Sequence, residues 1–205
     1  MQINLSTVTP VYQGENFLKQ LVDELATLRR QLESSRSPIS LVESVFVVDD
    51  AVDESLSVLK SLEIEHPWVR SIQLSANFGQ HPATMAGILY CTGDWIVTLD
   101  EDLQHHPETI LKLLRKAVTG NADIVYASSS ISSHKAYRNF ASRCFKKFVG
   151  ALLLNPNIEL FSSFRLIRGD IARSAAAVAM RITYFDIALG WFTKRVATLS
   201  IPLED

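Results

Sequence analysis

Several features that define whole classes of protein are missing from this chain of 205 residues. It has only two cysteines, Cys91 and Cys144, far apart in the sequence, which excludes a small disulfide scaffold and is typical of free thiols in a reducing compartment. No uncharged apolar run approaches the roughly 18–20 residues that cross a bilayer, and the first residues do not form a signal peptide. We therefore expect a soluble, cytoplasmic chain.

Net charge is nearly absent as well. The chain has 20 basic and 22 acidic side chains, a net charge of -2, so nothing in the total indicates a nucleic-acid partner. The charges are unevenly placed, because residues 1–127 hold 9 basic and 17 acidic side chains while residues 128–205 hold 11 and 5. Since no internal repeat or long flexible linker is present, we expect a single domain over residues 1–205 whose two halves face different chemistry.

Strands and helices are predicted to alternate along the first half. Short apolar runs predict strands at residues 3–8, 42–48, 69–74, 95–99 and 123–127, and helical spacing predicts helices at 15–32, 53–62, 82–90 and 107–118. This order predicts an α/β, Rossmann-like fold, in which a mostly parallel sheet has helices on both faces. Ligands bind such sheets at the carboxyl ends of the strands. That rule indicates the loops at residues 10–15, 49–53, 77–81 and 100–106.

The second half has a different pattern. A serine-rich stretch at residues 128–134 precedes an amphipathic helix predicted at 137–154, which places Arg138 and other basic side chains opposite phenylalanines and leucines. A core-packed helix with a solvated basic face would explain this pattern. A helix that lies against anionic lipid head groups would explain it equally. The two interpretations remain open.

Asp100-Glu101-Asp102 is the most informative local motif. It directly follows an apolar strand, so its carboxylates are expected at the ligand-binding edge of the sheet. Two carboxylates one residue apart can hold Mg²⁺ or Mn²⁺, which in turn binds diphosphate oxygens. An acidic start to the helix that begins near Pro107 is the structural alternative. The pair Asp49-Asp50 has the same two interpretations, since it can cap a helix or contact a nucleobase.

Several motifs stand in the order seen in family 2 glycosyltransferases of the GT-A fold. They are Val8–Glu15, Val47–Asp50, Asn77–His81, Thr98–Gln104, Pro107–Glu108 and Ser162–Ile167. The resemblance covers nearly the whole chain, and within the family it is closest to the bactoprenol- and dolichol-phosphate sugar transferases. It implies a nucleotide-binding half at about residues 1–127 and an acceptor-facing half at about 128–205.

The resemblance also implies roles for individual residues. Asp102 would be the principal metal ligand, with Asp100 shared between the metal and the nucleotide sugar. The nucleotide pocket would be formed by Pro10, Tyr12, Glu15, Asp49, Asp50, Asn77 and Asp100. The transferred sugar and the acceptor phosphate would meet Gln104, Ser163 and Arg165, and Arg138 could attract an anionic lipid-linked phosphate. The chain departs from the family at Ala51-Val52, where Gly-Ser is usual, so the turn beneath the base is expected to differ.

Asp186 is the residue whose role stays open at this stage. By family position it is the candidate general base for a hydroxyl acceptor, whereas an acceptor phosphate is already ionised and needs little help. As a lone aspartate it is equally explained as a helix cap or an ion-pair partner. His81, His105 and His106 are not expected to form a metal cluster, because loop histidines are commonly unliganded.

Together these features predict an inverting glycosyltransferase that moves a sugar from a UDP- or GDP-sugar to a polyprenyl phosphate. The alternatives are transfer to a saccharide hydroxyl and a nucleotide-binding module with impaired catalysis. The expected cofactor is Mg²⁺ or Mn²⁺. We expect a cytoplasmic protein peripheral to, or tethered at, the inner membrane face; a homodimer is left open. Since relatives continue with a basic segment, often followed by membrane helices, we expect an excised catalytic domain or a short natural form.

Overall fold

The computed structural model describes residues 2–129, 162–179 and 184–201. The helix predicted at residues 137–154 lies outside these ranges, as do Arg138 and Cys144. Within the described ranges, no helix is both long enough and apolar enough to cross a membrane.

Strands and helices alternate through the first half, as the sequence predicts. The elements are β1 (Ile3–Val11), α1 (Leu18–Ser34), β2 (Ile39–Val48), α2 (Ser55–Glu65), β3 (Val69–Gln73), α3 (Gln80–Tyr90), β4 (Trp95–Thr98), α4 (Thr109–Thr119), β5 (Ile124–Ser129), β6 (Arg165–Arg168), α6 (Gly169–Val178), α7 (Phe185–Phe192) and β7 (Val196–Ile201). In the first half each predicted element is present, with its ends shifted by three residues or fewer.

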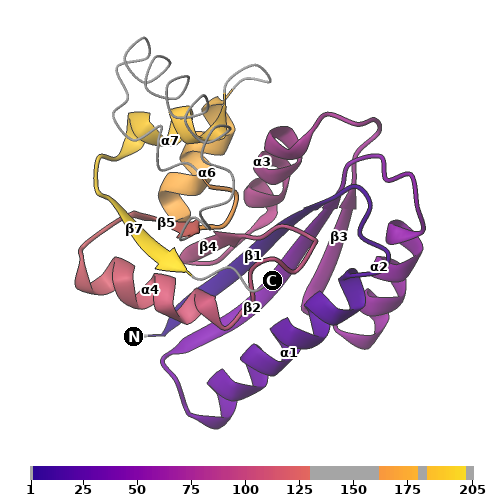
Figure 1. Ribbon diagram of the computed structural model, residues 1–205, viewed down its shortest axis with the longest axis horizontal. Coiled ribbons are helices and arrows are strands. Elements are labelled where there is room, and N and C mark those ends of the chain that lie inside the picture. Colours follow the sequence, from indigo (N-terminus) through magenta and orange to yellow (C-terminus); the bar gives the residue numbers. More distant parts are fainter. Residues whose placement is uncertain (1, 130–161, 180–183, 202–205) are drawn as a thin grey trace, which may run out of the picture.

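The strands form one sheet with the order β3-β2-β1-β4-β6-β5-β7 (Figure 1). The pairs β1–β2, β1–β4, β2–β3 and β5–β7 are parallel, whereas β6 is antiparallel to both of its neighbours. The mostly parallel sheet is therefore confirmed. Because β6 and β7 come from the second half, both halves of the chain contribute to the same sheet.

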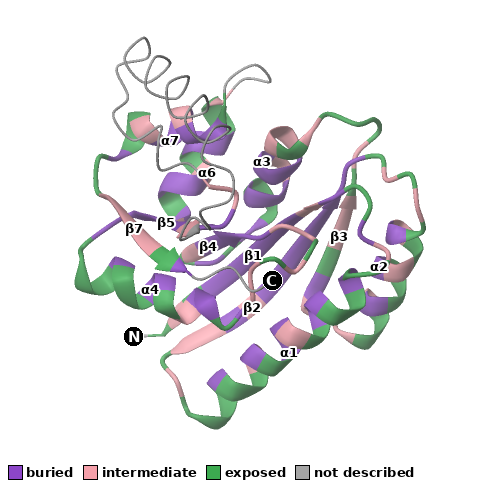
Figure 2. Ribbon diagram, in the orientation of Figure 1, coloured by how far each residue is buried: buried purple, intermediate pink, exposed green. Residues whose placement is uncertain are grey.

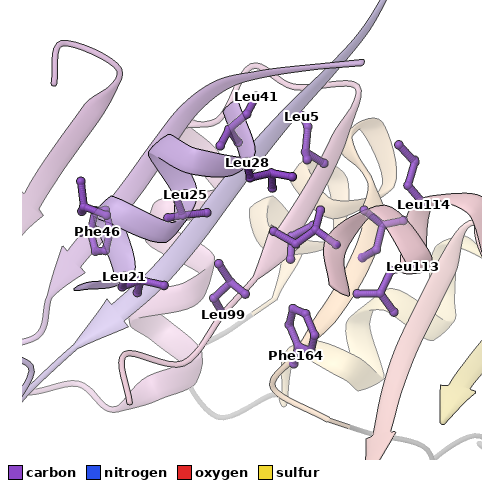
Figure 3. Packing of buried hydrophobic residues seen from close by; sticks show 14 of the residues in the cluster. Leu5, Leu21, Leu25, Leu28, Leu41, Phe46, Leu99, Leu113, Leu114 and Phe164 are labelled. Atoms are coloured by element: carbon purple, nitrogen blue, oxygen red, sulfur yellow. The ribbon is translucent and has the colours of Figure 1, made fainter. Parts of the chain in front are cut away.

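Two hydrophobic cores lie on opposite faces of the sheet, and side-chain alternation along the strands separates them. On β2, for example, Phe46 and Val48 join one core while Val45 and Val47 join the other. The first core packs the sheet against α1 and α4, and Figure 3 shows leucines of both helices meeting Leu5, Leu99 and Phe164. The second core packs it against α3, α6 and α7. The central strands are thus buried on both faces (Figure 2), which explains why apolar residues occupy consecutive positions in stretches such as Val45–Val48.

Strand β6 and helix α6 follow one another without a loop, and no prediction covered them. The junction requires Gly169, because a Cβ at that position would lie 2.2 Å from the backbone oxygen of Gly93. The Gly169 N–H donates to the backbone oxygen of Asp94 at 2.7 Å, which holds the junction against the start of β4. As a result, β6 lies directly beside β4, and its first residue, Arg165, is opposite Thr98.

Candidate active site

A cavity of about 480 Å³ opens at the carboxyl ends of β1, β2 and β4. This is the edge at which parallel sheets bind their ligands. The cavity is lined by Pro10, Val11, Tyr12, Asp49, Asn77, Gly79, Gln80, Asp100, Glu101, Asp102 and Ser163. Of the residues predicted to contact donor or acceptor, the structure thus brings together Pro10, Tyr12, Asp49, Asn77, Asp100, Asp102 and Ser163.

The two aspartates of the Asp100-Glu101-Asp102 motif both lie in the cavity wall. Gln80 donates its Nε2 hydrogen to Asp100 Oδ1 at 2.7 Å, and the Ser163 hydroxyl donates to Asp100 Oδ2. Asp102 is exposed, and its Oδ1 accepts the Gln104 N–H at 3.2 Å. Within the described ranges neither aspartate forms an ion pair, so no basic side chain of these ranges neutralises either negative charge.

This arrangement fits a divalent cation that is shared with a substrate. Carboxylate oxygens are the ligands that Mg²⁺ and Mn²⁺ prefer, and Mg²⁺ commonly takes one or two protein carboxylates together with substrate phosphates and waters. In the described part of the chain no cluster of three or more histidine, cysteine or acidic side chains could hold a metal by itself. The donor set therefore suits a cation that binds with a diphosphate better than a closed structural metal site.

Glu101, between the two aspartates, has a different task that sequence reasoning missed. Its Oε2 accepts the Tyr12 N–H at 3.0 Å and its Oε1 accepts the Gln13 N–H at 3.1 Å. A Cβ at Gly14 would lie 2.6 Å from Glu101 Oε2, so the loop after β1 approaches closely. Burial raises the pKa of Glu101, and the two N–H groups oppose that rise. Glu101 thus joins the loop that carries Tyr12 to the loop that carries the aspartates.

Asp49 is buried and holds the loop after β3. Its two carboxylate oxygens accept the N–H groups of Phe78 and Gly79 at 2.8 and 2.7 Å. These bonds fix the part of the cavity wall that contains Asn77 and Gly79. The backbone φ of Gly79 is 91°, a conformation that glycine adopts more readily than other residues. The helix-cap alternative applies instead to Asp53, whose Oδ1 accepts the Ser55 N–H at the start of α2.

Besides Arg165, three described residues predicted to bind donor or acceptor lie outside the cavity wall. Glu15 accepts the Glu54 N–H at 2.9 Å and so ties the loop after β1 to α2. Asp50 is exposed and adopts a φ of 53°, a left-handed conformation that aspartate tolerates better than most residues. Asp50 thus takes the left-handed position of the turn that precedes Ala51, the position at which the resemblance implies a glycine. Gln104 lines a neighbouring groove between α1 and α4 rather than the cavity.

Arg165 and Asp186 are brought together, but behind the cavity wall. Each side chain is 3% exposed, and Arg165 Nη1 lies 2.7 and 2.9 Å from the two Asp186 oxygens. The Tyr126 hydroxyl donates to Asp186 Oδ1 at 2.8 Å. Burial and the Asp186 charge raise the pKa of Tyr126 well above its ordinary value, so this hydroxyl keeps its proton. Of the interpretations left open for Asp186, the structure favours the ion-pair partner.

Two solved structures show how far the arrangement of elements in this chain is shared. Glucosyl-3-phosphoglycerate synthase from Mycobacterium tuberculosis, in complex with Mn²⁺, UDP and phosphoglyceric acid, matches 98% of this chain and 69% of its own, with a TM-score of 0.64 and 13% identity. S. aureus TarS 1-349 in complex with UDP matches 100% of this chain and 61% of its own, with a TM-score of 0.64 and 14% identity. These similarities show the fold, which is the predicted GT-A fold.

Curated proteins with similar sequences identify the family. Undecaprenyl-phosphate 4-deoxy-4-formamido-L-arabinose transferases from Pseudomonas fluorescens and Klebsiella pneumoniae are each 30% identical, over 198 and 203 residues. The matches cover 96% of this chain but 56% and 58% of the relatives, so the chain spans little more than half the length of these curated relatives. The family model described as glycosyl transferase family 2 matches residues 6–178, which include all the loops of the cavity wall. The chain therefore belongs to glycosyl transferase family 2.

Proposed function

We propose that this chain is the catalytic domain of an inverting glycosyltransferase that transfers a sugar from a nucleoside diphosphate sugar to a polyprenyl phosphate. The observation that carries the proposal is the position of Asp100 and Asp102, two carboxylates without cationic partners among the described residues, in the wall of a cavity at the carboxyl edge of the sheet. Membership of family 2 and the names of the curated relatives support the reaction class and the lipid-phosphate acceptor.

Different residues of the cavity wall would bind the nucleoside and the diphosphate of the donor. Pro10, Tyr12 and the loop held by Asp49 would enclose the nucleoside, because they lie on the strands at the β3 side of the aspartates. Asp100 and Asp102 would hold Mg²⁺ or Mn²⁺ against the diphosphate. When bound, the cation neutralises the negative charge that develops on the leaving diphosphate. The residues that would enclose the nucleoside and the carboxylates that would hold the cation thus follow neighbouring strands of the sheet. This arrangement would fix the donor in one orientation.

The reaction exchanges one carbon–oxygen bond for another. The bond from the anomeric carbon to the diphosphate breaks, and an oxygen of the acceptor phosphate forms the new bond from the opposite face. An ionised phosphate needs no proton removed before it attacks, whereas a sugar hydroxyl needs a general base within hydrogen-bond reach. Asp186, the predicted base, is enclosed by Arg165 and Tyr126. This enclosure favours the phosphate acceptor over the saccharide acceptor.

A lipid acceptor requires that the protein reach a membrane surface. Helix α7 and its flanks expose the aromatic side chains of Tyr184, Trp191 and Phe192, and the exposed Lys194 lies two residues after Phe192. Aromatic rings next to a basic side chain suit the interface between head groups and acyl chains. We therefore propose that the chain acts at the cytoplasmic membrane face as a peripheral domain. Sedimentation with anionic vesicles tests this, and a Trp191→Ala variant that sediments as fully as wild type would contradict it.

Transfer assays with two kinds of acceptor test the reaction itself. The purified chain is incubated with Mn²⁺, a panel of UDP- and GDP-sugars, and either undecaprenyl phosphate or a saccharide. We expect transfer to undecaprenyl phosphate only, and loss of that transfer in Asp102→Ala but not in the exposed control Glu65→Ala. Transfer to the saccharide alone would establish the hydroxyl-acceptor reaction instead. Binding of a nucleotide without transfer to either acceptor, found also with an intact full-length form, would indicate the module with impaired catalysis.

A further inference from the structure

We propose that Asp186 is a positioning residue: acting through Arg165 and the Ser162–Ser163 segment, it fixes the carboxylate of Asp100 in the cavity wall. The inference rests on the proposed function only in so far as Asp100 serves the donor's cation. It assigns to a buried ion pair behind the cavity a measurable effect on metal and donor binding, although neither Asp186 nor Arg165 lines the cavity.

The first contacts in this path join Asp186 to the backbone before β6. Arg165 Nη1 donates to both oxygens of Asp186 and also to the backbone oxygen of Ser162 at 2.9 Å. The Arg165 Nε has no hydrogen-bond partner among the described residues, and its guanidinium lies 5.2 Å from the centre of the Phe185 ring. Its observed hydrogen bonds are therefore made through Nη1, so the orientation of Arg165 depends on Asp186 and Ser162.

The next contacts join that backbone to the metal-binding motif. The backbone oxygen of Ser163 accepts a hydrogen bond from the Thr98 hydroxyl at the end of β4. The Ser163 hydroxyl in turn donates to Asp100 Oδ2, two residues beyond Thr98. Ser163 thus holds both the end of the strand and the carboxylate that follows it. Groups that hydrogen-bond a metal ligand orient it, and their loss typically lowers metal affinity about 10–100-fold.

The contacts of Asp186 are better suited to positioning than to proton transfer. A general base must have a lone pair directed at the substrate, but Oδ1 of Asp186 already accepts from Tyr126 and Arg165, and Oδ2 accepts from Arg165. The side chain is buried in the second core, together with Tyr126 and Phe185. Asp186 therefore acts on the site through Arg165 rather than by touching a substrate.

The opposite end of β6 supplies a matched control. Its last residue, Arg168, lies 2.9 Å from the buried Asp123, which also accepts from Arg195 and Thr193. Asp123→Asn therefore weakens a second ion pair between a buried aspartate and an arginine of β6, although Arg168 is 39% exposed. However, its partner Arg168 is opposite Trp95, at the end of β4 far from Asp100, and none of the observed side-chain bonds of Asp123 leads to the cavity. Both substitutions should lower stability, but only Asp186→Asn should disturb Asp100.

Hydrogen exchange of the protein without ligand tests the path directly. We expect Asp186→Asn and Arg165→Lys to speed backbone exchange at residues 98–103 and 162–165, whereas Asp123→Asn, compared at an equal distance below its melting temperature, leaves those residues unchanged. Tyr126→Phe keeps the ion pair and should give a smaller change in the same segments. Because no donor is needed, this measurement judges the positioning role even if the proposed function fails.

Titration of UDP binding with Mn²⁺ then connects the path to function. In Asp186→Asn the Mn²⁺ concentration for half-maximal UDP binding should rise about tenfold, in Asp123→Asn it should stay within about twofold, and Asp186→Glu should restore part of the loss. Adding Ser163→Ala to Asp186→Asn should cost little more than the larger single effect, since both act on one path. Equal effects of Asp186→Asn and Asp123→Asn, or a fall in kcat with unchanged Mn²⁺ dependence, would overturn the proposal.

If the variants at positions 186 and 165 do not fold, Tyr126→Phe and Ser163→Ala decide the question. Among the observed side-chain hydrogen bonds, the Tyr126 hydroxyl contacts Asp186, so exchange at residues 98–103 that equals wild type would overturn the proposal. Faster exchange in the same segments as in Ser163→Ala would support it.

Discussion

Replacing Glu101 by Gln is expected to loosen the loop after β1 while leaving the fold intact. Each Glu101 oxygen accepts one backbone N–H, from Tyr12 at 3.0 Å and from Gln13 at 3.1 Å. A Gln amide keeps one acceptor oxygen but turns its NH₂ group toward the other N–H, so that two donors face each other. One hydrogen bond is lost and one backbone donor is left to find water.

The expected loss of stability is small. A hydrogen bond to a charged acceptor contributes about 1.5–3 kcal/mol. Because Tyr12 and Gln13 are exposed, water recovers part of this amount, and the substitution also removes the repulsion that Asp53 and Asp102 exert on the Glu101 charge. The net loss should be about 1 kcal/mol, which lowers the Tm of a chain of this size by about 2–4 °C.

The same substitution is expected to weaken binding of the donor. Tyr12 belongs to the cavity wall, so a loosened loop should weaken Mn²⁺-dependent UDP binding by about three- to tenfold, equal to about 0.7–1.4 kcal/mol. Differential scanning fluorimetry measures the Tm and calorimetry measures UDP binding. Glu65→Gln, at an exposed position on α2, is the control and should change neither. If Glu101→Gln binds UDP as tightly as wild type, Glu101 does not hold the loop in the way we describe.

Three further predictions concern buried groups. Asp49→Ala leaves the Phe78 and Gly79 N–H groups without their acceptor, so we expect a loss of about 2 kcal/mol, seen as a Tm about 4–8 °C lower, together with weaker UDP binding. Burial raises the pKa of Glu43, but hydrogen bonds from Thr92 and Ser6 and the Arg70 charge outweigh it and hold the pKa below its ordinary value of 4.5. The stability that Glu43 contributes is therefore complete above pH 4.5 and is lost as the pH falls through the lower pKa of the folded state. When Tm is measured against pH over that acidic range, the Tm of Glu43→Gln should fall less than that of wild type. An equal fall in both proteins would refute this. Burial raises the pKa of Cys91 to about 12, so mass spectrometry should find this thiol unmodified by iodoacetamide at pH 8 until the protein unfolds.

The sequence predicts the first half of the fold well because its signals are local. The strand at residues 42–48 is apolar on both faces at its end, the apolar residues of the helices recur at helical spacing, and the acidic loops fall at strand ends. The position of Asp100 and Asp102 follows from these signals together with the rule for parallel sheets. Strand β6 gives no such signal, since it has four residues and begins and ends with arginine.

The roles of Asp49 and Glu101 could not be predicted, and the alternatives for Asp186 could not be decided, because these roles depend on partners distant in sequence. Asp49 binds amides 29 and 30 residues away, Glu101 binds amides 89 and 88 residues away, and Asp186 binds Arg165 and Tyr126 at separations of 21 and 60 residues. A sequence shows that such carboxylates are present. It does not show whether each one faces the cavity or holds the cavity wall in place.

The central claim is that Asp100 and Asp102 bind a divalent cation together with the donor's diphosphate. Calorimetric titration of UDP into wild type and Asp102→Ala, each with and without Mn²⁺, tests it most directly. The account predicts that Mn²⁺ tightens UDP binding to wild type at least about tenfold, a difference of about 1.4 kcal/mol, and has no effect on binding to Asp102→Ala. Equal binding to wild type with and without Mn²⁺, or the same Mn²⁺ effect in both proteins, would contradict it.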